Sequence, residues 1–300
     1  MKSAYGPAAV LLVIALACLL APLYASNIAH TDPFRSNIQG TVFRDGHDVA
    51  ILEQNAEGLG LGATPIGPAL SGKFLLGADS QGRDIAARLL YGGRTSLLIA
   101  AGATAITLGL AMAIGVLAGS IGGITDGVLR WLLDLLWAFP VFLLAISLSA
   151  VMATANLHIG LFTIEPDNPA LTILILSVVF VPYVARPIRA QVIGLREAEF
   201  VQAAVSLGAT WRYVVWRHIV PQALSTAILF APTVIAFDIL TEASLSVLGV
   251  GIQPPGASWG TLIADGQGLI YARPAAAVAP GLAVVLTVLT LNRLADCVRR

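Results

Sequence analysis

Long apolar runs separated by shorter polar stretches make up most of this chain. A helix needs roughly 20 residues to cross the hydrocarbon core of a bilayer, and several of the runs reach that length. The runs lie near 8–25, 97–121, 131–153, 170–188, 222–249 and 274–294. The pattern therefore predicts an all-α integral membrane protein with six transmembrane helices.

The composition also favours a lipid environment. Of the 300 residues, 57% are hydrophobic and 11% are charged, whereas about 25% of the residues of an ordinary soluble domain are charged. The formal net charge is zero, which argues against nucleic acid as a partner. The cysteines and histidines are scattered without metal-ligand spacing, so we expect no metal site and no disulfide framework.

The first apolar run has two interpretations. Lys2 precedes it and small residues follow it, as in a cleaved signal peptide. The run is longer than a typical signal-peptide core, however, and Pro22 interrupts its end. We therefore interpret residues 1–25 as an N-terminal transmembrane helix, with cleavage as the alternative.

The basic residues indicate the orientation of the chain. An even number of spans places both termini on one side, and with the termini inside the short outer loops hold only Arg273. The segment 26–96 is longer than the roughly 60 residues over which the positive-inside rule is reliable. The rule predicts that both termini and the segment 189–221 are cytoplasmic.

The chain divides into three predicted regions. Residues 1–25 form the first helix, residues 26–96 an extracytoplasmic loop with an interfacial helix, and residues 97–300 a five-helix core that includes the loop 189–221. Gly, Asn, Asp and Pro are frequent in 26–76, which predicts an irregular loop with a small hairpin.

The last part of the outer region, 80–96, is amphipathic. Its apolar side chains share one helical face, and Arg83 and Arg88 lie away from that face. We expect an interfacial helix whose arginines snorkel to lipid headgroups. A gating or partner-docking role is the alternative.

The stretch GPALSGKF has the glycine and lysine spacing of a phosphate-binding loop. Phe74, however, stands where Ser or Thr must hold magnesium, and the stretch is predicted on the side without ATP. We therefore expect no nucleotide site here. If the protein uses ATP, another chain must supply it.

Small residues and one proline predict features of the spans. Close helix packing in lipid is expected along the second span, where glycines recur at short intervals. These are Gly109, Gly115, Gly119, Gly122 and Gly123. Pro140 removes a backbone hydrogen bond and is expected to kink the third span.

The segment 196–221 predicts two short helices joined at a glycine. In a helix from Arg196 to Leu207, one face collects Phe200, Ala203, Ala204 and Leu207. Gly208 suits the left-handed position that ends a helix. Thr210 can cap a second helix from Trp211 to about Ile219, and Pro221 fits the first turn of the fifth span. The alternative is a solvated loop without a docking surface.

Two carboxylates lie inside the fifth predicted span. Asp238 and Glu242 are four residues apart and share a helical face. Charges in hydrocarbon are costly and face a cavity or a partner. We expect them either to line a translocation path or to pair with a second subunit. Farther on, GVGIQPPGASWG predicts an outer turn in which Trp259 anchors at the interface.

The segment QAAVSLG, followed by Pro221, resembles the EAA loop of ABC importer permeases. That motif has Glu-Ala-Ala, then a spaced Gly, and later Ile-x-Leu-Pro. The matching positions are Ala203, Ala204, Gly208 and Pro221. The departures are Gln202 for the Glu, His218 for the Ile and Val220 for the Leu.

Further motifs are similar to the C-type permease of oligopeptide and dipeptide importers. They are LGADSQGRDIAARLLYGGRTSL (with Ala78 for a usual Thr), DLLWAFPVFLLAIS, VARPIRAQVIGLREAEFV, ILTEASLSVLGVGIQPPGASWG and NRLADCVRR. The resemblance covers most of 75–300 and leaves 35–75 unmatched.

The resemblance implies a type I ABC importer permease fold in a bacterial inner membrane, importing short peptides. It implies a homologous second permease, two ATP-binding subunits that hold ATP and magnesium, and an extracytoplasmic substrate-binding protein. This chain then binds no cofactor and is not an enzyme. The residues implied in ATPase coupling are Phe200, Gln202, Ala203, Ala204, Leu207, Gly208 and Pro221.

Other functions remain as alternatives. The same family can import nickel or another small solute. A secondary transporter driven by an ion gradient typically has inverted repeats with broken central helices, and no convincing internal repeat is found. A membrane enzyme would need a catalytic constellation, and none is visible in the sequence.

Overall fold

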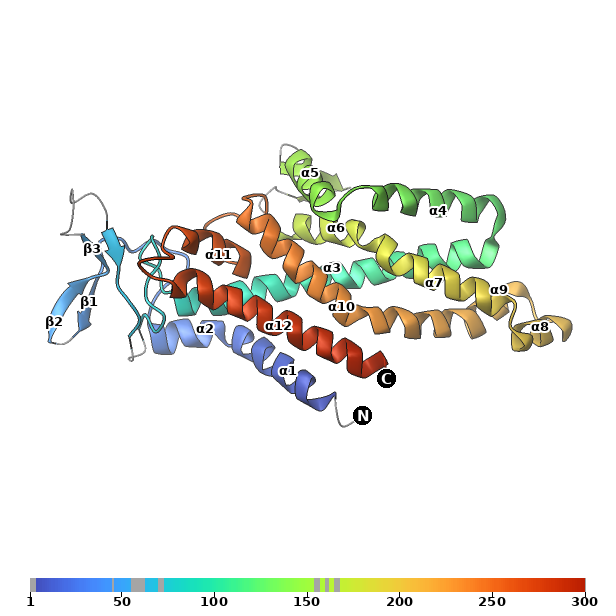
Figure 1. Ribbon diagram of the computed structural model, residues 1–300, viewed down its shortest axis with the longest axis horizontal. Helices are drawn as coiled ribbons and strands as arrows, with labels where there is room; N and C mark the ends of the chain where they lie inside the picture. The colour runs from blue at the N-terminus through green and yellow to red at the C-terminus, as the bar shows by residue number, and fades with distance from the viewer. Residues whose placement is uncertain are drawn as a thin grey trace.

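The computed structural model describes residues 4–44, 46–54, 63–69, 73–153, 157–159, 162–164 and 168–299. They form an elongated, mainly helical molecule with a small β region at one end (Figure 1). Lys2, Gly72 of the GPALSGKF stretch and Arg300 lie outside the described residues.

Three helices are long and apolar enough to cross a membrane by themselves within the described residues. The first is α3 (Ile85–Ile121) and the last is α12 (Ala275–Arg299). The third runs from Trp211 to Val247 and joins α9 (Trp211–Val214), η2 (Val215–Ile219) and α10 (Val220–Val247). They contain most of the second, fifth and sixth predicted spans.

The other three predicted spans fall on helix pairs that are bent at a short break. The pairs are α1 (Tyr5–Leu19) with α2 (Ala21–Tyr24) and η1 (Ala25–Ala29), α4 (Gly123–Ala138) with α5 (Val141–Ala153), and α6 (Pro169–Val179) with α7 (Val181–Arg196). The bends measure 52°, 91° and 40° respectively. The described residues therefore hold three to six candidate spans, depending on whether each pair crosses as one.

The third predicted span, 131–153, is not one continuous helix. Pro140 lies at the break between α4 and α5, and its carbonyl accepts the N–H of Leu144 in the first turn of the new helix. Proline itself has no N–H to continue α4. The expected kink is thus a sharp turn of 91°.

The hairpin expected in residues 26–76 is present. Strand β1 (Thr41–Arg44) pairs antiparallel with β2 (His47–Ala50), and β3 (Leu52–Gln54) pairs with β4 (Ala63–Pro65). A third pair, β5 (Leu157–Ile159) with β6 (Phe162–Ile164), follows α5. The first two pairs lie at the far end of the molecule from α8 (Figure 1).

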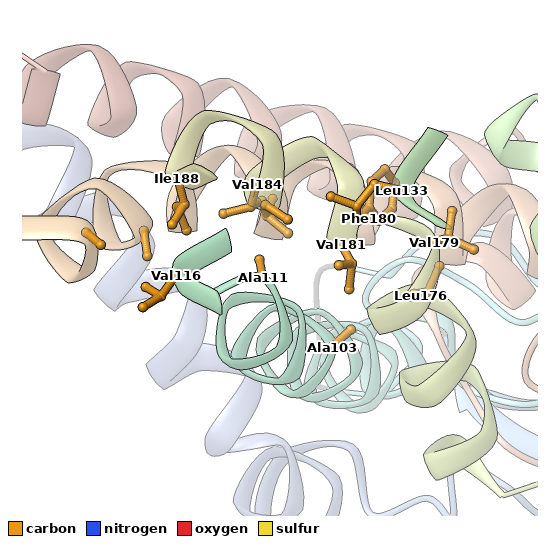
Figure 2. Close-up of a cluster of buried hydrophobic side chains, with 14 of the residues drawn as sticks. Ala103, Ala111, Val116, Leu133, Leu176, Val179, Phe180, Val181, Val184 and Ile188 are labelled. Atoms are coloured by element: carbon orange, nitrogen blue, oxygen red, sulfur yellow. The ribbon is translucent and has the colours of Figure 1, made fainter. Parts of the chain in front are cut away.

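The main core lies between α3 and α7, with α10 beside them. Figure 2 shows Ala103 and Ala111 of α3 on the side that faces buried side chains of α6 and α7, such as Leu176 and Val184. A Cβ atom on Gly115 would lie 2.7 Å from Cγ2 of Ile188, and one on Gly119 would lie 2.6 Å from Cβ of Val192. The predicted close packing is therefore confirmed at these two glycines.

The other glycines of that stretch do not pack in this way. A Cβ atom on Gly109 or Gly123 would meet nothing within 4 Å. A Cβ atom on Gly122 would meet only the guanidinium of Arg196, at 3.1 Å. A glycine-rich pattern alone did not distinguish contact positions from open ones.

Residues 80–96 are not a separate interfacial helix. Helix α3 begins at Ile85 and continues through the membrane-length segment to Ile121. Arg83 is 6% exposed and Arg88 is 1% exposed. The prediction that these arginines snorkel to headgroups is wrong, because both form buried ion pairs with aspartates.

A short helix, α11 (Trp259–Gln267), was not foreseen in the predicted outer turn. Ser258 caps it: its hydroxyl accepts the N–H of Thr261, whose own hydroxyl accepts the N–H of Ser258. Trp259 is 1% exposed, and its indole N–H donates to the carbonyl of Leu89 at 3.1 Å. The expected interface anchor is instead a core residue that attaches α11 to α3.

Candidate functional site

The two predicted helices joined at Gly208 are called the elbow from here on. The elbow lies at the end of the molecule opposite the β region (Figure 1). Its first arm, α8, runs from Glu199 to Ser206 and is shorter than the predicted helix. Arg196 ends α7 instead, and Ala198, in extended conformation, precedes α8. The charged turn between the two helices therefore separates the arm from the membrane-length segment.

Gly208 forms the bend as predicted. Its φ is +90°, a left-handed conformation that costs glycine little. The N–H of Gly208 donates to the carbonyl of Val205 at 2.9 Å, and the N–H of Ala209 donates to that of Ala204 at 3.0 Å. These two bonds are the Schellman pattern, which satisfies carbonyls at the helix end.

The second arm is continuous with the fifth span. The Thr210 hydroxyl accepts the N–H of Tyr213, which confirms the predicted cap. Pro221 lies in the first turn of α10, as expected, but no break precedes it. Pro221 has no N–H for the carbonyl of Arg217, and the backbone just upstream widens into the π-turns of η2. The second helix of the elbow is therefore not separate, but forms the N-terminal part of one continuous helix that runs to Val247.

The elbow has an inward and an outward face. Val201, Val214 and Ile219 are fully buried beneath it. Ala204 is half-buried against the same core, so it does not lie on the open face as predicted. Apolar and aromatic side chains remain exposed on the outside, namely Phe200, Ala203, Val205, Leu207, Trp211, Tyr213 and Trp216.

Arg196 and His218, to which the sequence assigned no structural role, make contacts that join the parts of the elbow. The Arg196 guanidinium donates to the carbonyl of Gly119 at 3.2 Å and lies 5.8 Å from the ring centre of Trp211. The His218 ring lies between Phe200 of the first arm and Tyr213 of the second, at 6.1 and 5.9 Å. In the sequence, these contacts were indicated only by the presence of a cation and several aromatic residues in one short segment.

Gln202 occupies the position of the motif Glu and is exposed. Its amide donates to the carbonyl of Glu197 at 3.1 Å. The side chain therefore braces the turn before α8 through a neutral hydrogen bond. It has no charge to offer a partner.

Asp238 and Glu242 lie inside the chain, between α10 and α3, and both are 0% exposed. Thr104 donates to Asp238 at 2.7 Å, while the second oxygen of that carboxylate has no hydrogen-bond partner among the residues that the structure describes. Neither residue reaches the surface in this conformation.

Glu242 organises a denser network. It accepts from Ser96 of α3 at 2.9 Å and from Ser246 at 2.8 Å. The backbone N–H of Trp259 donates to the same Ser96 hydroxyl at 3.1 Å. Glu242 thus connects α10, α3 and the start of α11.

A buried ionic cluster, not foreseen from the sequence, joins the outer region to α3 and α11. Asp79 pairs with Arg83 at 2.7 Å and with Arg88 at 3.4 Å. Both arginines also pair with Asp265 of α11 at 3.1 Å. Asp84 caps α3 just outside the span, and burial raises the pKa of its carboxyl.

Within the part of the chain that the structure describes, no group of three His, Cys, Asp or Glu side chains is placed to hold a metal ion. The polar groups of the molecule instead connect helices to one another. The elbow combines exposed apolar side chains with a hydrogen-bonded connection to the end of α3.

The sequence matches the family described as binding-protein-dependent transport system inner membrane component, over residues 105–300. It is 34% identical over 226 residues to the glutathione transport system permease protein GsiD of Pectobacterium atrosepticum, covering 75% of this chain and 70% of that protein. It is also 34% identical over 227 residues to a putative peptide transport system permease protein of Brucella suis, covering 76% and 72%.

Solved structures agree at the level of the fold. A chain from the crystal structure of an amino acid ABC transporter with histidines is similar with a TM-score of 0.52 and 17% identity, covering 70% of this chain and 92% of that chain. A chain of the MetNI methionine ABC transporter in an inward-facing conformation gives 0.50 and 18%, covering 71% and 97%.

These likenesses confirm the resemblance found in the sequence and the prediction of a transport subunit rather than an enzyme. The mainly helical fold with several candidate spans fits the same assignment. The chain belongs to the family of inner-membrane permease components of binding-protein-dependent transport systems.

Proposed function

We propose that this chain is the permease subunit of an ATP-driven importer that carries short peptides across the bacterial cytoplasmic membrane. The names of the relatives, which are glutathione and peptide transport permeases, support this substrate class. In this proposal the chain crosses the membrane six times, with both termini and the elbow on the cytoplasmic side.

The observation that carries the proposal is the elbow itself. Its outer face presents exposed apolar side chains, Leu207 being 89% and Phe200 45% exposed. Such a surface in water favours contact with a protein partner. We assign the contact to a groove on an ATP-binding subunit. The coupling residues are Phe200, Gln202, Ala203, Ala204, Leu207, Gly208 and Pro221.

Movement of the ATP-binding subunits would reach the spans through rigid connections. The second arm is continuous with α10 as one helix. The hydrogen bond from Arg196 to the carbonyl of Gly119 connects the turn before the first arm to the end of α3. Arg189 of α7 pairs with Asp126 of α4 nearby. A push on the elbow would therefore shift several helices together, as rigid-body switching requires.

The remaining parts of the transporter belong to other chains. A homologous second permease would complete the path, and an extracytoplasmic binding protein would deliver the peptide. ATP and magnesium would be held by two ATP-binding subunits, and this chain would bind no cofactor. Asp238 and Glu242 would line the path only in a state in which α10 moves away from α3.

The test is a substitution at Gly208 in the reconstituted transporter. The space around its Cβ position is open, so Gly208→Ala disturbs only the left-handed backbone, at a cost of about 1–2 kcal/mol. Gly208→Pro cannot adopt a φ of +90° at all. We expect reduced dipeptide uptake per ATP hydrolysed in the first variant and uncoupling in the second.

The matched control is Gly194→Ala in α7, where the Cβ position is also open and φ is helical. It should transport like the wild type. Full coupled uptake by Gly208→Pro would refute the elbow as the coupling element. Uptake of nickel but not of dipeptides would leave the mechanism intact and replace the substrate. Uptake without ATP-binding subunits would favour an ion-driven carrier.

A further inference from the structure

A groove runs along the outside of the molecule between its first and last helices. It is lined by Gly6, Pro7 and Val10 of α1 and by Leu286, Leu289, Thr290 and Arg293 of α12, with a volume of about 420 Å³. The two helices lie side by side in Figure 1, with the chain ends close together. The groove therefore lies toward the side on which both termini emerge.

The lining is apolar except at one end. Val10, Leu286 and Leu289 are 40%, 51% and 58% exposed. The hydroxyl of Thr290 donates to the carbonyl of Leu286 and is satisfied within its own helix. An aliphatic strip of this kind, on a membrane-length helix, suits a hydrocarbon chain rather than water.

Arg293 supplies the polar end. Its side chain is exposed and makes no hydrogen bond or ion pair among the described residues. Among the described residues that line the groove, Arg293 is the charged one. The free cation thus lies where an anionic group next to an aliphatic chain would be bound.

We propose that this groove binds one phospholipid with a net negative headgroup, its acyl chain between α1 and α12 and its phosphate at Arg293. The order of the surface, aliphatic and then cationic, matches the order of groups in such a lipid. Basic residues at a membrane surface attract anionic lipids. The site attaches α1, which precedes the matched family region, to the helix that ends the permease core.

Titration of the detergent-purified full chain, followed by native mass spectrometry, measures the proposed selectivity. The probes are dioleoyl phosphatidylglycerol and, as the zwitterionic comparison, dioleoyl phosphatidylcholine. We expect the first phosphatidylglycerol to bind more tightly. Arg293→Gln should weaken that binding about fivefold and leave phosphatidylcholine unchanged, because one basic residue at the surface contributes about that factor.

A second variant tests the place of the acyl chain. A Cβ atom at Gly6 would meet nothing within 4 Å, and Gly6 lines the groove, so the bulk of Gly6→Trp is expected to occupy it. It should reduce the binding of both lipids. Gly281→Trp, at an equally open glycine of α12 that does not line the groove, is the matched control and should bind like the wild type. Val10→Trp replaces Gly6→Trp if that variant fails to insert.

Three outcomes would overturn the proposal. Equal affinity for the two lipids would remove the role of charge. Unchanged binding in both tryptophan variants would place the lipid elsewhere. A photoactivatable phosphatidylglycerol that labels the isolated chain beside Gly6, but not the assembled transporter, would show that a protein subunit covers the groove.

Discussion

At the residue scale, the glycines of α3 show that the absence of a single Cβ atom can decide how closely two helices pack. Gly115 and Gly119 allow the backbone of α3 to lie directly against α7, with Ile188 and Val192 filling the space a side chain would need. Gly109, on the same helix, faces open space. In lipid, where hydrophobic burial between helices contributes little, such contacts are a main source of helix association.

We therefore expect Gly119→Val to destabilise the protein by about 1–3 kcal/mol through overpacking. Gly109→Val has no neighbour within 4 Å at its Cβ and should change the stability little. Both variants lower the glycine content of the same helix equally, so thermal unfolding in detergent isolates the contact. Equal melting temperatures for the two variants would contradict the packing role.

At the element scale, buried ion pairs add to apolar burial in holding the start of α3. Arg88 lies in its second turn, buried between Asp79 of the outer region and Asp265 of α11. Removing Arg88 would leave Arg83 as the remaining counter-charge for both Asp79 and Asp265. We therefore expect the outer region, α3 and α11 to be joined less firmly when Arg88 is removed.

Arg88→Met keeps the length of the side chain and removes its charge. We expect it to lower the free energy of unfolding by about 1–3 kcal/mol, because Arg83 still pairs with both aspartates. Arg94→Met on the same helix is the control, because Arg94 is exposed and stands outside the ionic cluster, with its guanidinium 5.5 Å from the centre of the Tyr91 ring. Proteolysis of the outer region should increase in Arg88→Met alone.

At the scale of the whole molecule, the two ends of the helical region carry different structures. The β1–β2 hairpin lies at one end, and the elbow lies at the other (Figure 1). Phe43 of the hairpin is 71% exposed, and Ala203 of the elbow is also exposed. If the helices between them cross the membrane, these two residues face different compartments.

Cysteine labelling tests this arrangement in intact cells. In a background with Cys18 and Cys297 replaced by alanine, Phe43→Cys should react with a membrane-impermeant maleimide. Ala203→Cys should react only after the cytoplasmic membrane is opened. The reverse pattern would invert the proposed topology and remove the elbow from the side where ATP is found.

The sequence by itself determined the features that depend on local backbone chemistry. Apolar length identified the segments of α3, α10 and α12, because a bilayer sets the length of a span. Gly208, Thr210 and Pro221 were placed correctly, since caps and left-handed turns need only nearby residues. The family resemblance was also present in the motifs alone.

Only the tertiary structure decided which side chains are buried and which way each face points. Arg88 was expected at lipid headgroups, yet its partner Asp265 is 177 residues away in the chain. Ala204 faces the core, and Trp259 is enclosed by α3, for the same reason. A polar residue in an apolar chain is exposed or buried according to the partners that folding brings to it, and sequence periodicity does not contain those distances.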